Sequence, residues 1–269
     1  MTCQVITFGN FKGGTGKTSN STLSGIEFAR RGYKTLLLDL DPQANATNLY
    51  LKTKENVDKK VVTFNSTLMS GIQHDDLKST VINVLPNLDL LPSSADFALY
   101  PRFMETKIED YNGRVKYLSK LLRPFKDEYD LIIIDTPPTI SIITDSALYA
   151  SDYCVIVLQT QERSLQGAEA FIKYIQEEII NTFKAPTLDV WGILPVLLKK
   201  RVLIDTSTLA VAREKFGSET ILKTTIKNME RIKRYDVTGV TFDDQFDRAV
   251  QKVYSNVADD IIERIRVTE

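Results

Sequence analysis

The sequence is poor in the residues that build metal centres, redox sites and disulfide frameworks. Its 269 residues include one histidine, His74, and two cysteines, Cys3 and Cys154, which lie far apart. A zinc site or a disulfide scaffold needs several such residues, so neither is expected, and two distant thiols suit a reducing cytosol. The chain also lacks an uninterrupted apolar run of about 18 residues and a basic-then-apolar N-terminal signal, so we expect no membrane span and no secretory leader.

An excess of charge of one sign is also missing. The chain has 34 Lys and Arg against 35 Asp and Glu, which gives a net charge of −1. The whole chain therefore offers no electrostatic argument for binding nucleic acid or membrane, and only a local patch could supply one. Hydrophobic residues make up 43% of the sequence, which is enough for a sizeable core. No linker, repeat or low-complexity tract interrupts the pattern, so residues 1–269 are expected to form one domain.

Short apolar runs alternate with amphipathic stretches along the chain. The runs predict strands at 4–10, 34–41, 87–93, 129–138, 152–160, 188–198 and 219–226. Helical spacing predicts helices that include 17–31, 113–123, 164–183, 206–216 and 243–266. Strands that are apolar on both faces and alternate with helices indicate a doubly wound α/β fold, with a mostly parallel sheet and helices on both faces. Residues 52–86 are polar and weakly patterned, and we interpret them as a surface excursion.

A glycine-rich stretch follows the first predicted strand. The segment "GNFKGGTGKTSN" (9–20) ends the P-loop pattern G-x-x-x-x-G-K-[ST] correctly, but Phe11 replaces the first glycine of that pattern. Between a strand and a helix, such a loop turns backbone N–H groups and the helix N-terminus toward phosphate oxygens. The alternative is a turn that merely joins strand to helix. We predict a nucleotide site that includes Lys12, Gly13, Gly14, Thr15, Gly16, Lys17, Thr18 and Ser19.

Three carboxylates are candidates to complete this site. Lys17 is expected to reach the β- and γ-phosphates and the Thr18 hydroxyl to bind Mg²⁺. Asp135 ends the apolar run "LIII" and is placed to hold the Mg²⁺ shell, unless it is simply a turn residue. Asp39 and Asp41 close the second strand in "DLDPQAN", and a side-chain period of two would turn both to the same side. Asp39 is then a metal-shell or structural group, and Asp41 could orient an attacking water.

These motifs carry a family resemblance. In this order, "KGGTGKT", "DLDPQAN" and "YDLIIIDTPP" resemble the ParA-type ATPases that partition plasmids and chromosomes. Those proteins belong to a group with a deviant Walker A motif, which also includes MinD and the nitrogenase iron protein. The resemblance covers nearly the whole chain. It implies that ATP and Mg²⁺ bind, that Lys12, Lys17 and Asp41 serve catalysis, and that Thr18, Asp39 and Asp135 surround the metal.

The resemblance also implies partners. Lys12 matches the signature lysine, which reaches across a homodimer to the ATP of the other subunit. Phe11 departs from the group, where Gln or Gly is common, and we expect to find it at the dimer face. The ATP-bound dimer would hold DNA without sequence preference, and a separate ParB-type centromere-binding protein would stimulate weak hydrolysis. The implied location is cytoplasmic and nucleoid-associated. Too few residues precede the loop for the N-terminal helix-turn-helix domain that longer plasmid relatives carry.

One segment is basic enough to suggest where DNA would bind. Residues 199–234 hold ten Lys and Arg against four Asp and Glu. Such a run is usually a solvated helix face, but the resemblance favours contacts to DNA phosphates. The candidates are Lys199, Arg201, Lys227, Arg231, Lys233 and Arg234.

Other functions remain open at this point. A MinD-like ATPase that works at a membrane surface is the first alternative, but the tail "SNVADDIIERIRVTE" carries Asp259, Asp260 and Glu263 and suits an anionic membrane poorly, so we expect no membrane partner. A scaffold that holds ATP without hydrolysing it is the second, and a small-molecule ligase or kinase on the same fold is the third. Lys12 and Asp41 favour neither of these two. No N-K-x-D motif for guanine is present, which favours ATP over GTP.

Overall fold

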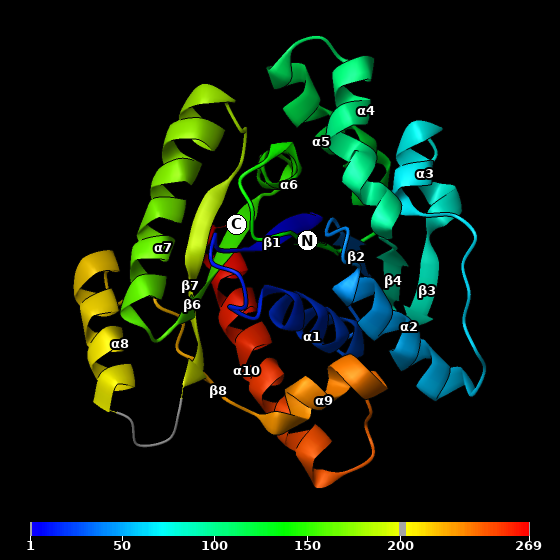
Figure 1. Ribbon diagram of the computed structural model, residues 1–269. Coiled ribbons are helices and arrows are strands. Elements are labelled where there is room, and N and C mark those ends of the chain that lie inside the picture. The colour runs from blue at the N-terminus through cyan, green and yellow to red at the C-terminus, as the bar shows by residue number, and fades with distance from the viewer. Residues whose placement is uncertain (1, 199–202, 269) are drawn as a thin grey trace.

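The computed structural model of the chain describes residues 2–198 and 203–268 (Figure 1). Within them, eight strands form one sheet in the order β3-β4-β2-β5-β1-β6-β7-β8. Neighbouring strands are parallel except β3 and β4, an antiparallel pair at one edge. The predicted doubly wound, mostly parallel α/β fold is confirmed. The strands are β1 (Gln4–Gly9), β2 (Thr35–Asp39), β3 (Ile82–Leu85), β4 (Leu88–Leu91), β5 (Leu131–Asp135), β6 (Tyr153–Gln159), β7 (Asp189–Leu198) and β8 (Ile226–Lys227).

Helices cover both faces of this sheet. One face packs against α1 (Lys17–Arg30), α2 (Asn45–Asp58), α9 (Glu230–Thr238) and α10 (Gln245–Thr268), which lie together in the lower part of Figure 1. The other face packs against the helices between α2 and α9. No helix among the described residues is long and apolar enough to cross a membrane. The helices of the second face are α3 (Leu68–Gln73), α4 (Tyr100–Lys107), α5 (Tyr111–Lys126), α6 (Ile142–Ala150), α7 (Glu162–Tyr174), which continues as a π-helix (Ile175–Thr182), and α8 (Leu203–Phe216).

The central strands serve two cores at once. In β5, Leu131 and Ile133 pack on the side of α1, and Ile132 and Ile134 pack on the opposite side. All four side chains are 0–1% exposed. Alternate residues of a strand point to opposite faces, so a strand covered on both sides must be apolar throughout. This is why the runs of apolar residues predicted the central strands well.

The predicted strand ends differ from the observed ones. The strand predicted at 34–41 ends at Asp39, and the one predicted at 129–138 ends at Asp135, before its two prolines. The strand predicted at 219–226 is reduced to an isolated bridge at Ile221 and the two-residue β8. In each case the end of the strand is set by where pairing with the neighbouring strand stops. Amino-acid composition does not show that position.

The expected surface excursion at 52–86 is wrong in part. Helix α2 continues to Asp58, α3 follows, and β3 pairs with β4 along the edge of the sheet. These elements are short, and each packs through a few side chains, such as Leu68, Met69 and Ile72 in α3. So few apolar residues do not make a period that stands out from the sequence.

Helix α1 and helix α2 approach each other closely. The Tyr50 hydroxyl of α2 donates to the Thr22 carbonyl of α1 at 2.8 Å. A Cβ atom on Gly25 would lie 2.5 Å from that hydroxyl, so the approach requires glycine here. Helix α1 ends as predicted, because Gly32 follows it with a φ of 91°.

Gly25→Ala should destabilise the protein, although alanine is favoured in a helix by about 1 kcal/mol. The physical reason is the 2.5 Å approach of the new Cβ to the Tyr50 hydroxyl. The same substitution in a Tyr50→Phe background, which lacks the hydroxyl, should cost less. Thermal unfolding of the four proteins makes a double-mutant cycle. An equal cost in both backgrounds would contradict this account of the helix contact.

Candidate nucleotide site

The loop between β1 and α1 has the backbone geometry of an anion cradle. Gly14 (φ 71°) and Gly16 (φ 87°) adopt the left-handed conformation that other residues rarely take. Within the described part of the chain, the backbone N–H groups of Gly13, Gly14 and Gly16 donate to no protein acceptor. These donors and the N-terminus of α1 can bind phosphate oxygens. Gly13 has room for a Cβ, whose nearest neighbour would be Pro138 at 3.9 Å.

Groups beneath the loop hold it in place. Thr15 is fully buried, and Ser19 is partly buried at the first turn of α1. Asn20 donates to the Gly16 carbonyl at 2.8 Å and accepts from the Tyr254 hydroxyl of α10 at 3.1 Å. The sequence analysis did not name Asn20 or Tyr254. Asn20 lies two residues past the motif, but its partner is 234 positions away, so no local signal could identify the pair.

Lys17 is positioned to neutralise an anion in the cradle. Its side chain is 6% exposed, and its ammonium makes a long contact of 3.5 Å to the Lys12 carbonyl. Burial lowers the pKa of Lys17, and the nearby charges of Asp135 and Asp41 act in the opposite direction. A buried cation without a close anionic partner is well suited to bind phosphate.

Asp135 ends β5 beside the first turn of α1. Its Oδ2 atom accepts from the Thr18 hydroxyl at 2.8 Å, and its Oδ1 atom accepts from the Ser21 hydroxyl at 3.0 Å. The two predicted residues Thr18 and Asp135 are therefore in direct contact. Ser21 was not predicted, although residues three apart share a helix face and the spacing from Thr18 could have indicated it.

Asp39 and Asp135 are register partners on neighbouring parallel strands. Both are completely buried. Burial raises the pKa of each carboxyl, and the charge of Asp39 raises the pKa of Asp135 further, to about 7. Two carboxylates held side by side away from water create a strong demand for cations.

Asp39 and Asp41 have different surroundings. Asp39 accepts from the Thr47 amide at 2.9 Å and from the Thr47 hydroxyl at 2.7 Å, so its Oδ2 atom is occupied by the first turn of α2. This favours a structural role for Asp39. Asp41 lies beyond the end of β2, so strand periodicity does not set its direction. Its amide donates to Asp39 at 3.1 Å, and its Oδ1 atom accepts from the Gln43 amide at 2.9 Å.

The donor set fits a hard divalent ion that brings its own water. Among the described residues, no three His, Cys, Asp or Glu side chains converge to hold a metal. An ion here would bind the Thr18 hydroxyl and phosphate oxygens, and Asp135 could accept from its water. Mg²⁺ suits such a site, because it keeps several waters and is commonly held together with substrate phosphates.

The ammonium of Lys12 is bound within its own chain. It donates to Gln159 at 3.2 Å, to Gln161 at 2.9 Å and to the Ser164 hydroxyl at 2.9 Å. Gln159 also donates to the Gly14 carbonyl at 2.6 Å. These partners come from the end of β6 and the start of α7, and none of them was predicted. Lys12 and Lys17 therefore have separate environments on the same loop.

Phe11 packs against helix α7. Its ring lies edge-on to Phe171, with ring centroids 4.7 Å apart, and edge-on to Tyr174 at 5.3 Å. It is partly buried against the core of that side. These contacts within the chain give an aromatic side chain at this position a packing role.

Comparison with known proteins decides the family. The AAA domain family matches residues 3–190. The chain is 32% identical over 202 residues to the virulence plasmid ParA family protein pGP5-D of Chlamydia psittaci. This alignment covers 71% of the present chain and 68% of pGP5-D. The chain belongs to the ParA family of P-loop ATPases.

Two further proteins extend the similarity over more of the chain. The chain is 29% identical to the sporulation initiation inhibitor protein Soj of Bacillus subtilis, over 85% of this chain and 86% of Soj. A crystal structure of a putative plasmid partition protein from Borrelia burgdorferi B31, bound to AMPPNP, superposes with a TM-score of 0.78 at 23% identity. That superposition covers 97% of this chain and 99% of the other, and it supports the fold.

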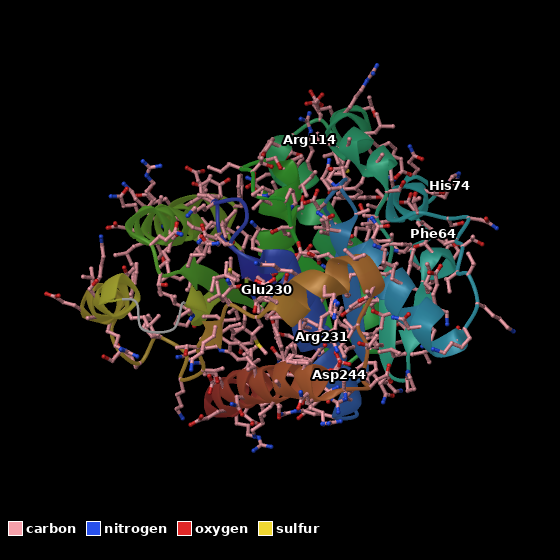
Figure 2. All side chains as sticks on the ribbon, turned by 60° about the horizontal axis from the view of Figure 1, so that its bottom comes forward. Phe64, His74, Arg114, Glu230, Arg231 and Asp244 are labelled. Atoms are coloured by element: carbon pink, nitrogen blue, oxygen red, sulfur yellow. The ribbon has the colours of Figure 1, made fainter. Side chains whose placement is uncertain are left out.

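The basic candidates of this ParA-family chain divide into three groups. Lys199 and Arg201 lie outside the described residues. Lys227, Lys233 and Arg234 are exposed on or beside α9. Arg231 is different, because its side chain is 13% exposed and forms ion pairs with Asp244 and Asp247 (Figure 2). Arg231 therefore fastens α9 to α10, and we remove it from the set proposed to touch DNA.

Asp135→Asn should stabilise the nucleotide-free protein in a pH-dependent way. The folded-state pKa of Asp135, about 7, lies above the ordinary aspartate value of 3.8, so wild-type stability falls as pH rises through this interval. The variant has no carboxyl group at this position to ionise, so it should not lose stability in this way. Its Tm should exceed that of the wild type by at least about 2 °C at about pH 8, and by a smaller margin at about pH 5.

Thermal unfolding of both proteins at the two pH values measures this effect. Asp58→Asn, a change on the exposed end of α2, is the control and should show no such dependence. A larger increase in Tm for Asp135→Asn at the lower pH than at the higher pH would contradict the raised pKa of Asp135.

Proposed function

We propose that this chain is a ParA-type partition ATPase. ATP binding would close two copies into a sandwich dimer, and the dimer would bind DNA without sequence preference. Slow Mg²⁺-dependent hydrolysis, stimulated by a separate ParB-type centromere-binding protein, would release the DNA and so segregate plasmid or chromosome. The protein would act as a single P-loop domain in the cytoplasm, associated with the nucleoid.

The residues of the site divide the chemistry among them. The loop amides and Lys17 would hold the phosphates, while Thr18 and Asp135 would hold Mg²⁺, which would neutralise charge that develops on the phosphate oxygens. Asp41 would orient a water whose oxygen attacks the γ-phosphorus as the bond to the bridging oxygen of ADP breaks. The Oδ1 atom of Asp41 accepts the Gln43 amide, and a carboxylate has further lone pairs for a water.

The environment of Lys12 is the observation that best supports a dimer. Lys17 already supplies a cation to the cradle, and Lys12 is held by the neutral oxygens of Gln159, Gln161 and Ser164. Exchanging these acceptors for the phosphate of a partner's ATP would replace neutral hydrogen bonds by charge-assisted ones, which are stronger. A monomeric enzyme has no comparable use for a second lysine on this loop.

The relatives support the biological role. The protein from Borrelia burgdorferi is described as a plasmid partition protein and was solved with AMPPNP, and pGP5-D is a plasmid ParA family protein. By analogy, this chain would bind ATP and move DNA. The exposed cations on and beside α9 would supply the phosphate contacts that sequence-independent binding needs.

DNA binding should depend on ATP and on Lys12. Wild-type protein with ATPγS and Mg²⁺ should bind a DNA duplex at least about tenfold more tightly than with ADP or without nucleotide. Lys12→Ala should lose this gain while ATP affinity stays within about threefold, because Lys17 remains in the cradle. Fluorescence anisotropy measures the DNA affinity, and light scattering measures the mass of the dimer. Equal DNA affinity in all three nucleotide states would sink the proposal.

Lys233→Ala/Arg234→Ala should weaken DNA binding and lower its dependence on salt. Each lost phosphate contact should reduce the slope of log affinity against log salt by about 1. The matched control is Lys120→Ala/Arg123→Ala, which removes two exposed cations from α5 on the opposite face of the sheet. An equal loss in both double variants would indicate general electrostatics rather than a surface on α9.

A membrane surface is the second candidate target. Val237 is 74% exposed and Phe246 is 59% exposed, and Phe246 shares a surface hollow with Lys233 and Arg234. Cations next to exposed apolar side chains could also contact an anionic bilayer. Sedimentation with anionic vesicles and ATPγS separates the two targets. Binding to vesicles without binding to DNA would replace partition by a MinD-like function.

A further inference from the structure

One end of helix α2 is tied to the nucleotide site. Asp39 accepts both the Thr47 amide and the Thr47 hydroxyl, and the Ser93 amide donates to the same hydroxyl oxygen at 2.9 Å. The loop that carries Asp41 leads directly into the helix, because the Ala44 amide donates to the Asp41 carbonyl at 2.8 Å. A shift of either carboxylate must therefore act on the first turn of α2.

The other half of α2 is tied to the end of α9. The Lys52 ammonium donates to the Asp236 carbonyl at 2.6 Å, and the Asn56 amide group donates to the Thr238 carbonyl at 2.7 Å. The Val240 amide donates to the Thr53 hydroxyl at 2.9 Å. The last carbonyls of a helix have no partners within it, so α2 supplies caps that α9 cannot make for itself.

The contact between these helices leaves no space for adjustment. Gly239 ends α9 with a φ of 71°, and a Cβ there would lie 2.5 Å from the Lys52 carbonyl carbon. Backbone against backbone cannot yield as a flexible side chain can. Figure 1 shows α9 next to α2 and α10 on the same side of the sheet.

The middle of α2 is also fixed. Tyr50 is fully buried and bonded to α1, so α2 cannot bend easily between its two ends. At its far side, α9 is held to α10 by Arg231 and by the Tyr235 hydroxyl, which donates to Asp247 at 2.7 Å. A movement of α2 would thus carry α9 and the start of α10 together.

We propose that α2 transmits the state of the nucleotide site to the basic surface of α9, with Lys52 and Asn56 as the positioning residues. This inference rests on the proposed function, because it explains how ATP could change the DNA affinity of Lys233 and Arg234. The path has two fixed ends, Thr47 at the buried carboxylate and Lys52 with Asn56 at the carbonyls of α9. Neither positioning residue touches the loop or the cations themselves.

Hydrogen–deuterium exchange tests the link without DNA. In the wild type, Mg²⁺ with ATPγS should change the exchange rate of amides in residues 230–240 by at least about threefold. In Lys52→Met and Asn56→Ala, the nucleotide-induced change in exchange at residues 230–240 should be less than half of the wild-type change. The corresponding change at α1 and the affinity for ATPγS should stay within about twofold of wild type. Lys54→Met, which breaks only the surface pair with Asp58, is the matched control and should behave as wild type.

Two arms separate this inference from the proposed function. Lys12→Ala, expected to bind ATPγS without dimerising, should keep the exchange change at α9, so a change seen only in dimers would overturn the link. A wild type with no exchange change at α9 also overturns it, even if DNA binding depends on ATP. If the wild type shows the exchange change but does not bind DNA, the link from the nucleotide site to α9 is supported and the proposed partition function is contradicted. The wild-type measurement can contradict the link without any variant, so the test remains valid if a variant fails to fold.

Discussion

The structure depends on two carboxyl groups placed side by side away from water. Asp39 and Asp135 end neighbouring parallel strands, pair in register and are completely buried. Such a pair is unfavourable on its own, so each carboxylate is surrounded by donors: Thr18 and Ser21 from α1 hold one, and Thr47 from α2 holds the other. The two helices that frame the site are therefore tied to one buried pair. The same pair creates the demand that Lys17 and a divalent ion would meet.

The two lysines of the loop belong to different parts of the fold. Lys17 is buried near Asp135 and Asp41, and burial lowers its pKa while their charges raise it. Lys12 is bound by the end of β6 and the start of α7. Phe11, between Asn10 and Lys12, packs on the same helix α7. The first half of the loop is therefore supported by α7 and the second half by α1, so the two lysines have separate supports.

Sequence reasoning succeeded where neighbouring residues carry the signal. The loop glycines, Lys17 and Thr18 lie together as expected, because a strand, a turn and a helix N-terminus follow one another along the chain. It failed where the partner is remote. Thr47, Gln159 and Ser164 are ordinary polar residues in the sequence, and they became recognisable only when β2 and β6 placed them beside Asp39 and Lys12. The short elements of residues 52–86 were missed because each buries only a few side chains.

The sequence by itself determined the fold class, the phosphate loop and the family, since these follow from local periodicity and from motifs with fixed spacing. Only the tertiary structure decided which charges face solvent. Arg231 and Arg234 are three residues apart and look alike in the sequence, yet Arg231 is partly buried and held in ion pairs with Asp244 and Asp247, while Arg234 is exposed. The physical reason is that a charge becomes structural or functional according to the partners that packing brings to it, and those partners come from another helix.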